Sequence, residues 1–204
     1  DHPDIREFIN AKRVEEEKAW SLIEEGYPGG FNIPGGAYDS VYFQNSNFSV
    51  RVTDEFMRAV ETGEKFATRR RTDKSVVEWV EARDLMKEIS HGAWICGDPG
   101  LQFDTTINDW HTCPNSGRIN ASNPCSEYMH IDDSACNLAS INLLKYLGED
   151  GSFDIEKFNH TVRVLITAQD ILVDNASYPT EKIGRNARAY RQLGLGFANL
   201  GALL

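Results

Sequence analysis

The sequence predicts a mixed α/β fold in which helices separate short apolar strands. Three observations indicate it: a run of helix formers over residues 4–25, an alternation of Phe48, Val50 and Val52 with polar residues, and apolar residues at helical spacing between residues 154 and 174. Because helices stand between the strands, we expect the strands to pair in parallel.

The first quarter of the chain contains a helix, a loop and a strand. Residues 4–25 end at Gly26, and glycine readily adopts the left-handed conformation that follows many helices. Glycines and prolines between residues 29 and 36 predict an exposed loop. The short strand around residues 48–52 is followed by a brief helix from about Asp54 to Thr62.

Further along, Ser75-Val-Val-Glu78 has the pattern of a capping box, in which both polar side chains bind free N–H groups at a helix start. We expect that helix to run to about Ser90. A short apolar piece at residues 93–96, a turn at Gly97–Gly100 and a polar stretch to Pro124 come next. The last predicted helix spans roughly residues 154–174.

Composition limits the class of protein and the partners. The 204 residues are 41% hydrophobic and 25% charged, which fits one globular domain or a large part of one. A net charge of -10 argues against a nucleic-acid partner, which would need a broad basic surface. No run of 18 apolar residues and no cleavable signal pattern occur, so we expect no membrane partner and a cytoplasmic location.

The chain starts at Asp1 without Met and stops at Leu204 within an apolar stretch. Both ends therefore look like cuts in a longer protein.

Four cysteines occur without any Cys-x-x-Cys pair, and their spacings are 17, 12 and 11 residues. Tetrahedral zinc sites usually use such close pairs, so we expect no metal site. Two alternatives of other classes stay open. One is a zinc-binding interaction module, and the other is a thiol hydrolase with a histidine near Cys125.

The segment Asn123-Pro124-Cys125-Ser126-Glu127 is the strongest candidate site, and Cys136 follows eleven residues after Cys125. In an extended segment, alternate side chains point to the same side, so Asn123, Cys125 and Glu127 would share one face. One small polar substrate could then contact an amide, a thiol and a carboxylate. These groups together indicate thiol chemistry with proton transfer.

Two runs in this region resemble one enzyme family. Residues 113–129, from Cys113 to Met129, and residues 132–143, from Asp132 to Leu143, are similar to the large catalytic chain of ribonucleotide reductases, and most similar to the adenosylcobalamin-dependent class. Shorter matches occur at residues 2–5, 43–57, 97–100, 103–106 and 191–196. The resemblance covers nearly the whole chain, although family members are several times longer.

The resemblance implies a fold and a domain assignment. Residues 1–204 would be one piece of a single catalytic barrel domain, truncated at both ends. That domain is a ten-stranded α/β barrel, with Cys125 on a finger loop that enters the centre of the barrel.

The resemblance also implies radical reduction of ribonucleotides, expected as diphosphates, to 2'-deoxyribonucleotides. Adenosylcobalamin would generate a thiyl radical at Cys125, which abstracts the 3'-hydrogen, while Glu127 takes the 3'-hydroxyl proton. Asn123 would orient the sugar hydroxyls. Substrate-binding residues would be the whole segment, Ser122, Asn123, Pro124, Cys125, Ser126 and Glu127.

Cys136 would be one half of a dithiol that delivers reducing equivalents and ends as a disulfide. Its partner cysteine would lie upstream of Asp1. A thioredoxin-like or other thiol reductant would restore the dithiol, and an allosteric nucleotide would bind outside residues 1–204. The parent protein would form a homodimer.

Within the same reaction, the large subunit of the diiron-dependent class is the alternative. Its members resemble this segment less closely and usually have a longer insertion between the positions of Cys125 and Cys136.

Overall fold

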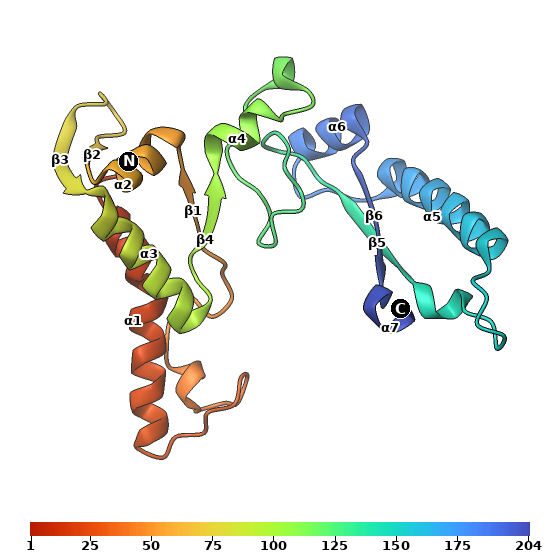
Figure 1. Cartoon of the computed structure of the whole chain (residues 1–204), viewed down its shortest axis with the longest axis horizontal. Coiled ribbons are helices and arrows are strands. Elements are labelled where there is room, and N and C mark those ends of the chain that lie inside the picture. Colours follow the sequence, from red (N-terminus) through yellow and green to blue (C-terminus); the bar gives the residue numbers. More distant parts are fainter. The chain divides into compact units, whose positions relative to one another are not determined.

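Three two-stranded sheets and the helices between them form the structure, a computed structural model that describes residues 1–204. Strand β1 (Ser49–Val52) pairs in parallel with β4 (Gly100–Phe103), and β5 (Asn137–Asn142) pairs in parallel with β6 (Leu193–Ala198), whereas β2 (Lys65–Arg69) and β3 (Val76–Glu81) form an antiparallel hairpin. The chain divides into two units, Asp1–Met129 and His130–Leu204. Figure 1 labels the helices and strands of both units.

The remaining elements alternate with these strands. In the first unit they are α1 (Ile5–Glu24), η1 (Ala37–Asp39), α2 (Asp54–Thr62), α3 (Ala82–Cys96), α4 (Asp104–Asp109) and η2 (Pro114–Ser116). In the second unit they are η3 (Leu143–Tyr146), α5 (Ile155–Asn175), α6 (Glu181–Tyr190) and α7 (Leu200–Leu203).

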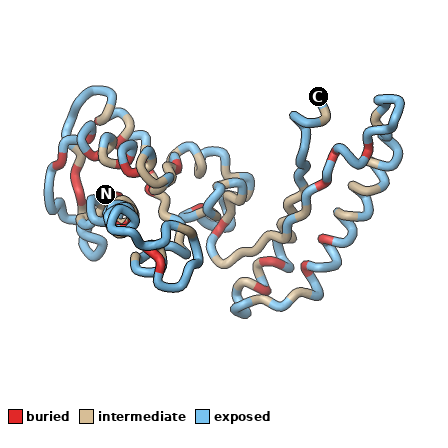
Figure 2. The backbone as a smooth tube through the Cα atoms, turned by 90° about the horizontal axis from the view of Figure 1, so that it is seen from below, coloured by how far each residue is buried: buried red, intermediate tan, exposed pale blue.

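The core of the first unit lies where α1, α2 and α3 meet the inner residues of β1. Parallel strands need a long crossover, and the chain supplies one between β1 and β4 through α2, the hairpin and α3. Together with α1 and β1, the crossover buries a cluster of apolar side chains: Ile9, Val50, Val52, Phe56, Ala59, Val80, Ala82, Leu85 and Ile89. Figure 2 colours the buried positions of the chain red. This packing fixes β1 and β4, the strands that reach the candidate site.

Several predicted elements are confirmed. Helix α1 ends just before Gly26, whose φ is +95°, and the alternating strand is β1. Helix α2 has the predicted bounds. Thr53 caps it by accepting a hydrogen bond from the Phe56 N–H at 3.3 Å, and Gly63 ends it with φ +77°.

The predicted capping box is wrong. Ser75 does not start a helix, because its N–H and its hydroxyl both donate to the Asp73 carboxylate, at 2.9 and 2.7 Å. The residues after Ser75 are β-branched and aromatic, and they pair with β2 as strand β3. Helix α3 begins only at Ala82 and runs beyond Ser90 to Cys96, so the apolar piece at residues 93–96 is its last turn.

The polar stretch after Gly100 is more ordered than the sequence predicted. The turn before it is present, with Gly97 at φ +79°. The polar stretch contains β4 and the short helix α4. Parallel pairing with β1 supplies hydrogen bonds to β4 that the local sequence does not reveal.

In the second unit, α5 packs against the β5–β6 sheet. The predicted helix over residues 154–174 is confirmed, with Asp154 capping it through the Lys157 N–H at 2.9 Å. Buried Gln169 of α5 donates from its amide to the carbonyls of Asn137 and Gly194, at 3.1 and 2.9 Å. One side chain therefore joins the helix to both strands.

The mixed α/β class is confirmed, and so is parallel pairing for β1 with β4 and for β5 with β6. For β2 and β3 the expected parallel pairing is wrong, because no helix separates them and a short turn joins them as an antiparallel hairpin. The strands of residues 1–204 form no closed barrel. No helix of the structure has both the length and the apolar character needed to cross a membrane.

Substitution of Ile9 tests the core of the first unit. Its side chain is 1% exposed, so Ile9→Ala should leave a cavity and lower the free energy of unfolding by about 2–5 kcal/mol. Urea denaturation measures the change. Ile33→Ala, at a site 40% exposed, is the matched control and should cost less than half as much. Equal losses for the two variants would contradict this placement of the core.

Candidate functional site

The candidate segment is a tight turn. The Ser126 N–H donates to the Asn123 carbonyl at 3.0 Å, which closes a four-residue turn with Pro124 and Cys125 at its centre. Proline suits the second position because its φ is already fixed near the value that the turn needs. Ser126 follows with φ +63°. The extended segment expected from the alternation of side chains is therefore wrong, and the chain folds back on itself.

Hydrogen bonds across its base hold the turn closed. Ser122 and Met129 form an isolated antiparallel bridge, and the Ser122 hydroxyl donates to the Tyr128 carbonyl at 2.7 Å. The Asn123 side-chain oxygen accepts from the Tyr128 N–H at 3.0 Å. Asn123 is thus fixed by the backbone on the far side of the turn.

The other end of the Asn123 amide reaches Glu127. A hydrogen bond from Asn123 lowers the pKa of the Glu127 carboxyl, and the Glu127 backbone N–H lowers it further, against a small opposing effect of desolvation. Glu127 is exposed. Its carboxylate is therefore ionised at neutral pH and able to accept a proton.

Cys125 occupies the outer corner of the turn and is exposed. Its thiol is open to a reactant that approaches from outside this chain. By contrast, Cys96 is half-buried at the end of α3, where its thiol lies 3.4 Å from the Gly92 carbonyl. Cys113 is half-buried beside His111, with 4.0 Å between its sulfur and the imidazole Nδ1.

The β1–β4 sheet contacts the turn through two residues that the sequence did not single out. Buried Gln102 of β4 donates from its amide Nε2 to the Ser126 hydroxyl at 3.1 Å. Arg51 of β1 donates to the Gln102 side-chain oxygen at 3.0 Å. The only signal in the sequence is that each is a long polar residue within a short apolar strand.

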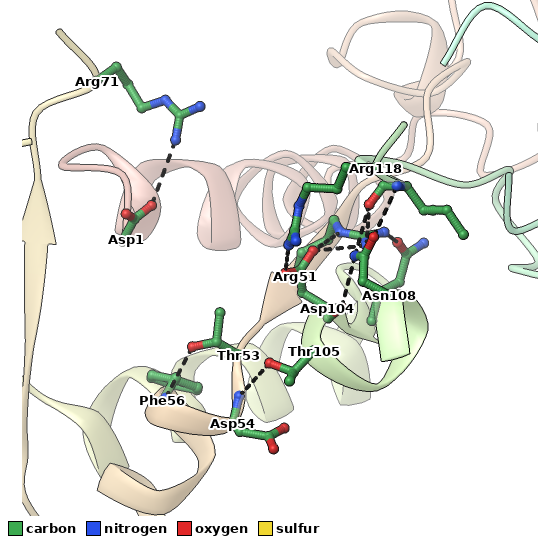
Figure 3. A network of polar contacts seen from close by, with 12 residues as sticks. Asp1, Arg51, Thr53, Asp54, Phe56, Arg71, Asp104, Thr105, Asn108 and Arg118 are labelled. Carbon is green, nitrogen blue, oxygen red and sulfur yellow. Dashed lines mark hydrogen bonds and ion pairs between the residues drawn. The ribbon is translucent and has the colours of Figure 1, made fainter. Parts of the chain in front are cut away.

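Arg51 also anchors the segment that leads into the turn (Figure 3). Its guanidinium donates to the Asp104 carboxylate at 2.9 Å, as Figure 3 shows. It also donates to the Ile119 carbonyl at 3.0 Å. Asn108 binds both backbone groups of Ile119, at 3.0 and 3.1 Å, and Arg118 pairs with Asp104. The chain three residues before Ser122 is therefore tied to β1 and α4.

Two hollows border the turn. One of about 580 Å³ is mainly apolar and includes Ser126 and Glu127 in its wall. The other, of about 510 Å³, is bordered by Ser122, Asn123 and Pro124. Gln102 lines both hollows, so it lies directly behind the turn.

Cys136 belongs to the second unit, just before β5. It is half-buried, and its thiol lies 3.6 Å from the Asn137 carbonyl. Gly194 stands beside it in β6: a Cβ there would come within 2.3 Å of the Leu138 side chain and 3.5 Å of the Cys136 sulfur. Gly194 is thus a strand residue that allows β6 to pack closely against β5.

No three His, Cys, Asp or Glu side chains among residues 1–204 are grouped so that they could hold a metal ion.

Comparison with protein-family models shows to which family the chain belongs. The family model described as ribonucleotide reductase, barrel domain, matches residues 1–204. The chain belongs to the ribonucleotide reductase family. The resemblance predicted from residues 113–143 is thereby confirmed, and it extends over the whole chain.

Individual ribonucleotide reductases agree with the family match. The chain is 59% identical to a vitamin B12-dependent ribonucleotide reductase of Rhodopirellula baltica and 55% identical to one of Streptomyces clavuligerus, over 100% of this chain and 20% and 21% of those proteins. It is 36% identical to a vitamin B12-dependent ribonucleoside-diphosphate reductase of Mycobacterium tuberculosis, over 100% of this chain and 26% of that protein. The chain thus spans about a fifth to a quarter of the length of these relatives.

Limited alkylation tests the exposure of the turn. Treating the native chain with iodoacetamide should modify Cys125 before Cys96, because Cys125 is exposed and Cys96 is half-buried at a helix end. Peptide mass spectrometry over a time course measures both rates. Cys125→Ser should remove the fastest phase. Modification of Cys96 at the same rate as Cys125 would contradict the described turn.

Proposed function

We propose that this chain carries the radical-bearing cysteine and the proton acceptor of a B12-dependent ribonucleotide reductase. The observation that carries the proposal is the turn at residues 123–126, in a chain of this family. There, Asn123 hydrogen-bonds the ionised Glu127, which directly follows the turn that carries the exposed thiol of Cys125. A thiol, a carboxylate and an amide on one short segment can meet the same sugar ring.

The reaction replaces the 2'-hydroxyl of a ribonucleotide by hydrogen. Hydroxide is a poor leaving group, and the neighbouring C–H bond does not react with ordinary bases. A radical at C3' overcomes both obstacles. The balanced reaction is one ribonucleotide and two thiols giving one deoxyribonucleotide, one disulfide and water.

Cys125 is the proposed hydrogen-atom acceptor. As a thiyl radical it takes the hydrogen from C3', so the S–H bond forms as the C3'–H bond breaks, and the same hydrogen returns at the end. Its place at the outer corner of the turn supports this role, because a substrate carbon must come into direct contact with the sulfur.

Glu127 is the proposed proton acceptor for the 3'-hydroxyl, and Asn123 orients the sugar hydroxyls. The exposure of Glu127 supports the first role, and its carboxylate is ionised at neutral pH, as a base must be before it accepts a proton. We assign substrate contact to the turn as a whole, which includes Ser122, Pro124 and Ser126 as well.

Cys136 is proposed as one half of the reducing dithiol, with its partner on a part of the parent protein outside residues 1–204. Each turnover oxidises the two thiols to a disulfide and supplies the two electrons that the substrate needs. A thioredoxin-like or other external thiol then reduces the disulfide by exchange.

We propose adenosylcobalamin as the cofactor, because the B12-dependent relatives are 59% and 55% identical over this whole chain. The cofactor supplies the radical, and the protein supplies placement. The residues present fit this need in one respect: the Cys125 thiol is open to a reactive group held outside this chain. The same relatives favour the B12-dependent class over the diiron-dependent one.

The same proposal includes the barrel, the substrate class and the assembly of the parent protein. The two units would be parts of one ten-stranded barrel domain, and the turn would be the tip of its central finger loop. The substrate would be a ribonucleoside diphosphate, as the name of the Mycobacterium tuberculosis relative suggests for that protein. The parent would work in the cytoplasm as a homodimer that binds an allosteric nucleotide elsewhere.

The radical role predicts the effect of replacing the thiol. In the parent protein that contains this chain, Cys125→Ser should abolish deoxyribonucleotide formation, because the O–H bond of serine is too strong for the radical to reside on oxygen. Chromatographic assay of the product measures it. Cys96→Ser is the matched control and should keep at least half of the rate. Turnover by Cys125→Ser would remove Cys125 from the radical role.

The hydrogen bond from Asn123 predicts a shift in pH dependence. A carboxylate with a lowered pKa serves as a base above that pKa, and the rate is lost as the pH falls through it. Asn123→Ala should raise the pKa of Glu127, so the acid side of the pH–rate profile moves to higher pH. Asn45→Ala, at an exposed loop position, should leave the profile unchanged.

Glu127→Gln completes the test in the same assay. It should lower the rate roughly 10²- to 10⁴-fold and remove that acid limb. An acid limb that is unchanged in both Asn123→Ala and Glu127→Gln would exclude Glu127 as the proton acceptor.

A further inference from the structure

Gln102 lies between a fixed cation and the candidate turn. Its side chain is 5% exposed on β4, its oxygen accepts from Arg51 at 3.0 Å, and its Nε2 donates to the Ser126 hydroxyl at 3.1 Å. Neither Gln102 nor Arg51 has a role in the function proposed above.

The direction of both hydrogen bonds follows from chemistry. The guanidinium of Arg51 can only donate, so the oxygen of the Gln102 amide must face it. The amide NH₂ must then face Ser126, and it too can only donate. The Ser126 hydroxyl oxygen is therefore an acceptor in this contact, and its own hydrogen remains available for another acceptor.

Arg51 cannot turn away to relax this arrangement. Its other N–H groups are bound to the Asp104 carboxylate and the Ile119 carbonyl, at 2.9 and 3.0 Å (Figure 3). The guanidinium is planar, so fixing two of its edges fixes the third. The orientation of the Gln102 amide is set by the sheet and not by the turn.

We propose that Gln102 is a positioning residue that directs the Ser126 hydroxyl hydrogen toward the substrate. The hollow of about 580 Å³ has Ser126 and Glu127 in the same wall, so a donor there meets a substrate oxygen next to the proton acceptor. The acceptor is a hydroxyl oxygen of the ribonucleotide sugar. This inference rests on the proposed function and adds a positioning residue and the direction of one hydrogen bond.

The sharpest test reverses the direction of the hydrogen bond between Gln102 and Ser126 without changing the shape of the residue 102 side chain. In Gln102→Glu the carboxylate still accepts from Arg51, but it cannot donate to Ser126. The Ser126 hydroxyl must then turn its hydrogen toward the carboxylate and away from the substrate. In the parent protein, we expect KM for the ribonucleotide to rise by about 3- to 10-fold, the range for one hydrogen bond.

Gln44→Glu is the matched control. It makes the same change of an amide to a carboxylate at an exposed position, and it should leave KM unchanged. A purely structural role of Gln102 would lower the amount of active enzyme, and hence the apparent kcat, with an unchanged KM and a lower melting temperature. That result would overturn the proposal.

A double-mutant cycle separates action through Ser126 from any other effect. Ser126→Ala should raise KM by a similar factor, and Gln102→Glu in that background should add less than about 2-fold, because both changes remove one interaction. Additive effects of the two changes would overturn the proposal.

Ser126→Gly keeps the test valid if Gln102→Glu fails to fold. Glycine favours the positive φ found at Ser126, so strain in the turn cannot explain a loss. We expect Ser126→Gly to raise KM as Ser126→Ala does. A wild-type KM in Ser126→Gly would exclude the hydroxyl as a substrate contact.

Wild-type turnover distinguishes this inference from the function on which it rests. A wild-type parent that forms no deoxyribonucleotide with adenosylcobalamin and a thiol reductant would overturn the proposed function. If the wild-type parent is active and Gln102→Glu has the same KM, only the role of Gln102 is overturned.

Discussion

The guanidinium of Arg51 is the constraint on which the first unit depends. It donates to a carboxylate, an amide oxygen and a backbone carbonyl, and these acceptors come from α4, β4 and the segment before the turn. A planar cation with several fixed donors can satisfy all three only in one orientation. The parallel pairing of β1 with β4 brings Arg51 beside Gln102, and the buried core behind β1 keeps that pairing in place. The sheet thereby sets the position of the turn through Gln102 and Ile119.

The side-chain amide of Asn123 makes two hydrogen bonds with different effects. The oxygen of Asn123 closes the turn by accepting from the Tyr128 N–H, while its hydrogen bond to Glu127 lowers the pKa of that carboxyl. Shape and protonation state are therefore coupled, since a change in the turn also changes how well Glu127 holds its charge. Cys125 remains exposed at the corner of the turn.

The second unit uses the same kind of connection with different residues. Gln169 joins α5 to both strands of the β5–β6 sheet, and Arg191, after α6, binds Asp170 and Asp174 of α5, at 2.8 and 2.9 Å. Cys136 thus precedes a strand whose position is set by a buried polar contact. In both units, the side-chain amide of a buried glutamine links elements that are distant in the sequence.

The sequence by itself determined the elements whose signals are local. Helices α1, α2 and α5 and strand β1 follow from the spacing of their residues, and Gly26 marks the end of α1. The sequence motif around Cys125 was enough to indicate the family. Tertiary structure decided the rest. Ser75 donates to Asp73 instead of capping a helix, because the valines that follow it pair with β2 as a strand. The residues at positions 123–127 form a turn and not an extended segment, and Gln102 lies behind it, because Arg51 and the pairing of β1 with β4 place it there. The hydrogen bonds of Gln102 with Ser126 and Arg51 join residues 24 and 51 positions apart, and a local sequence pattern does not reveal such contacts.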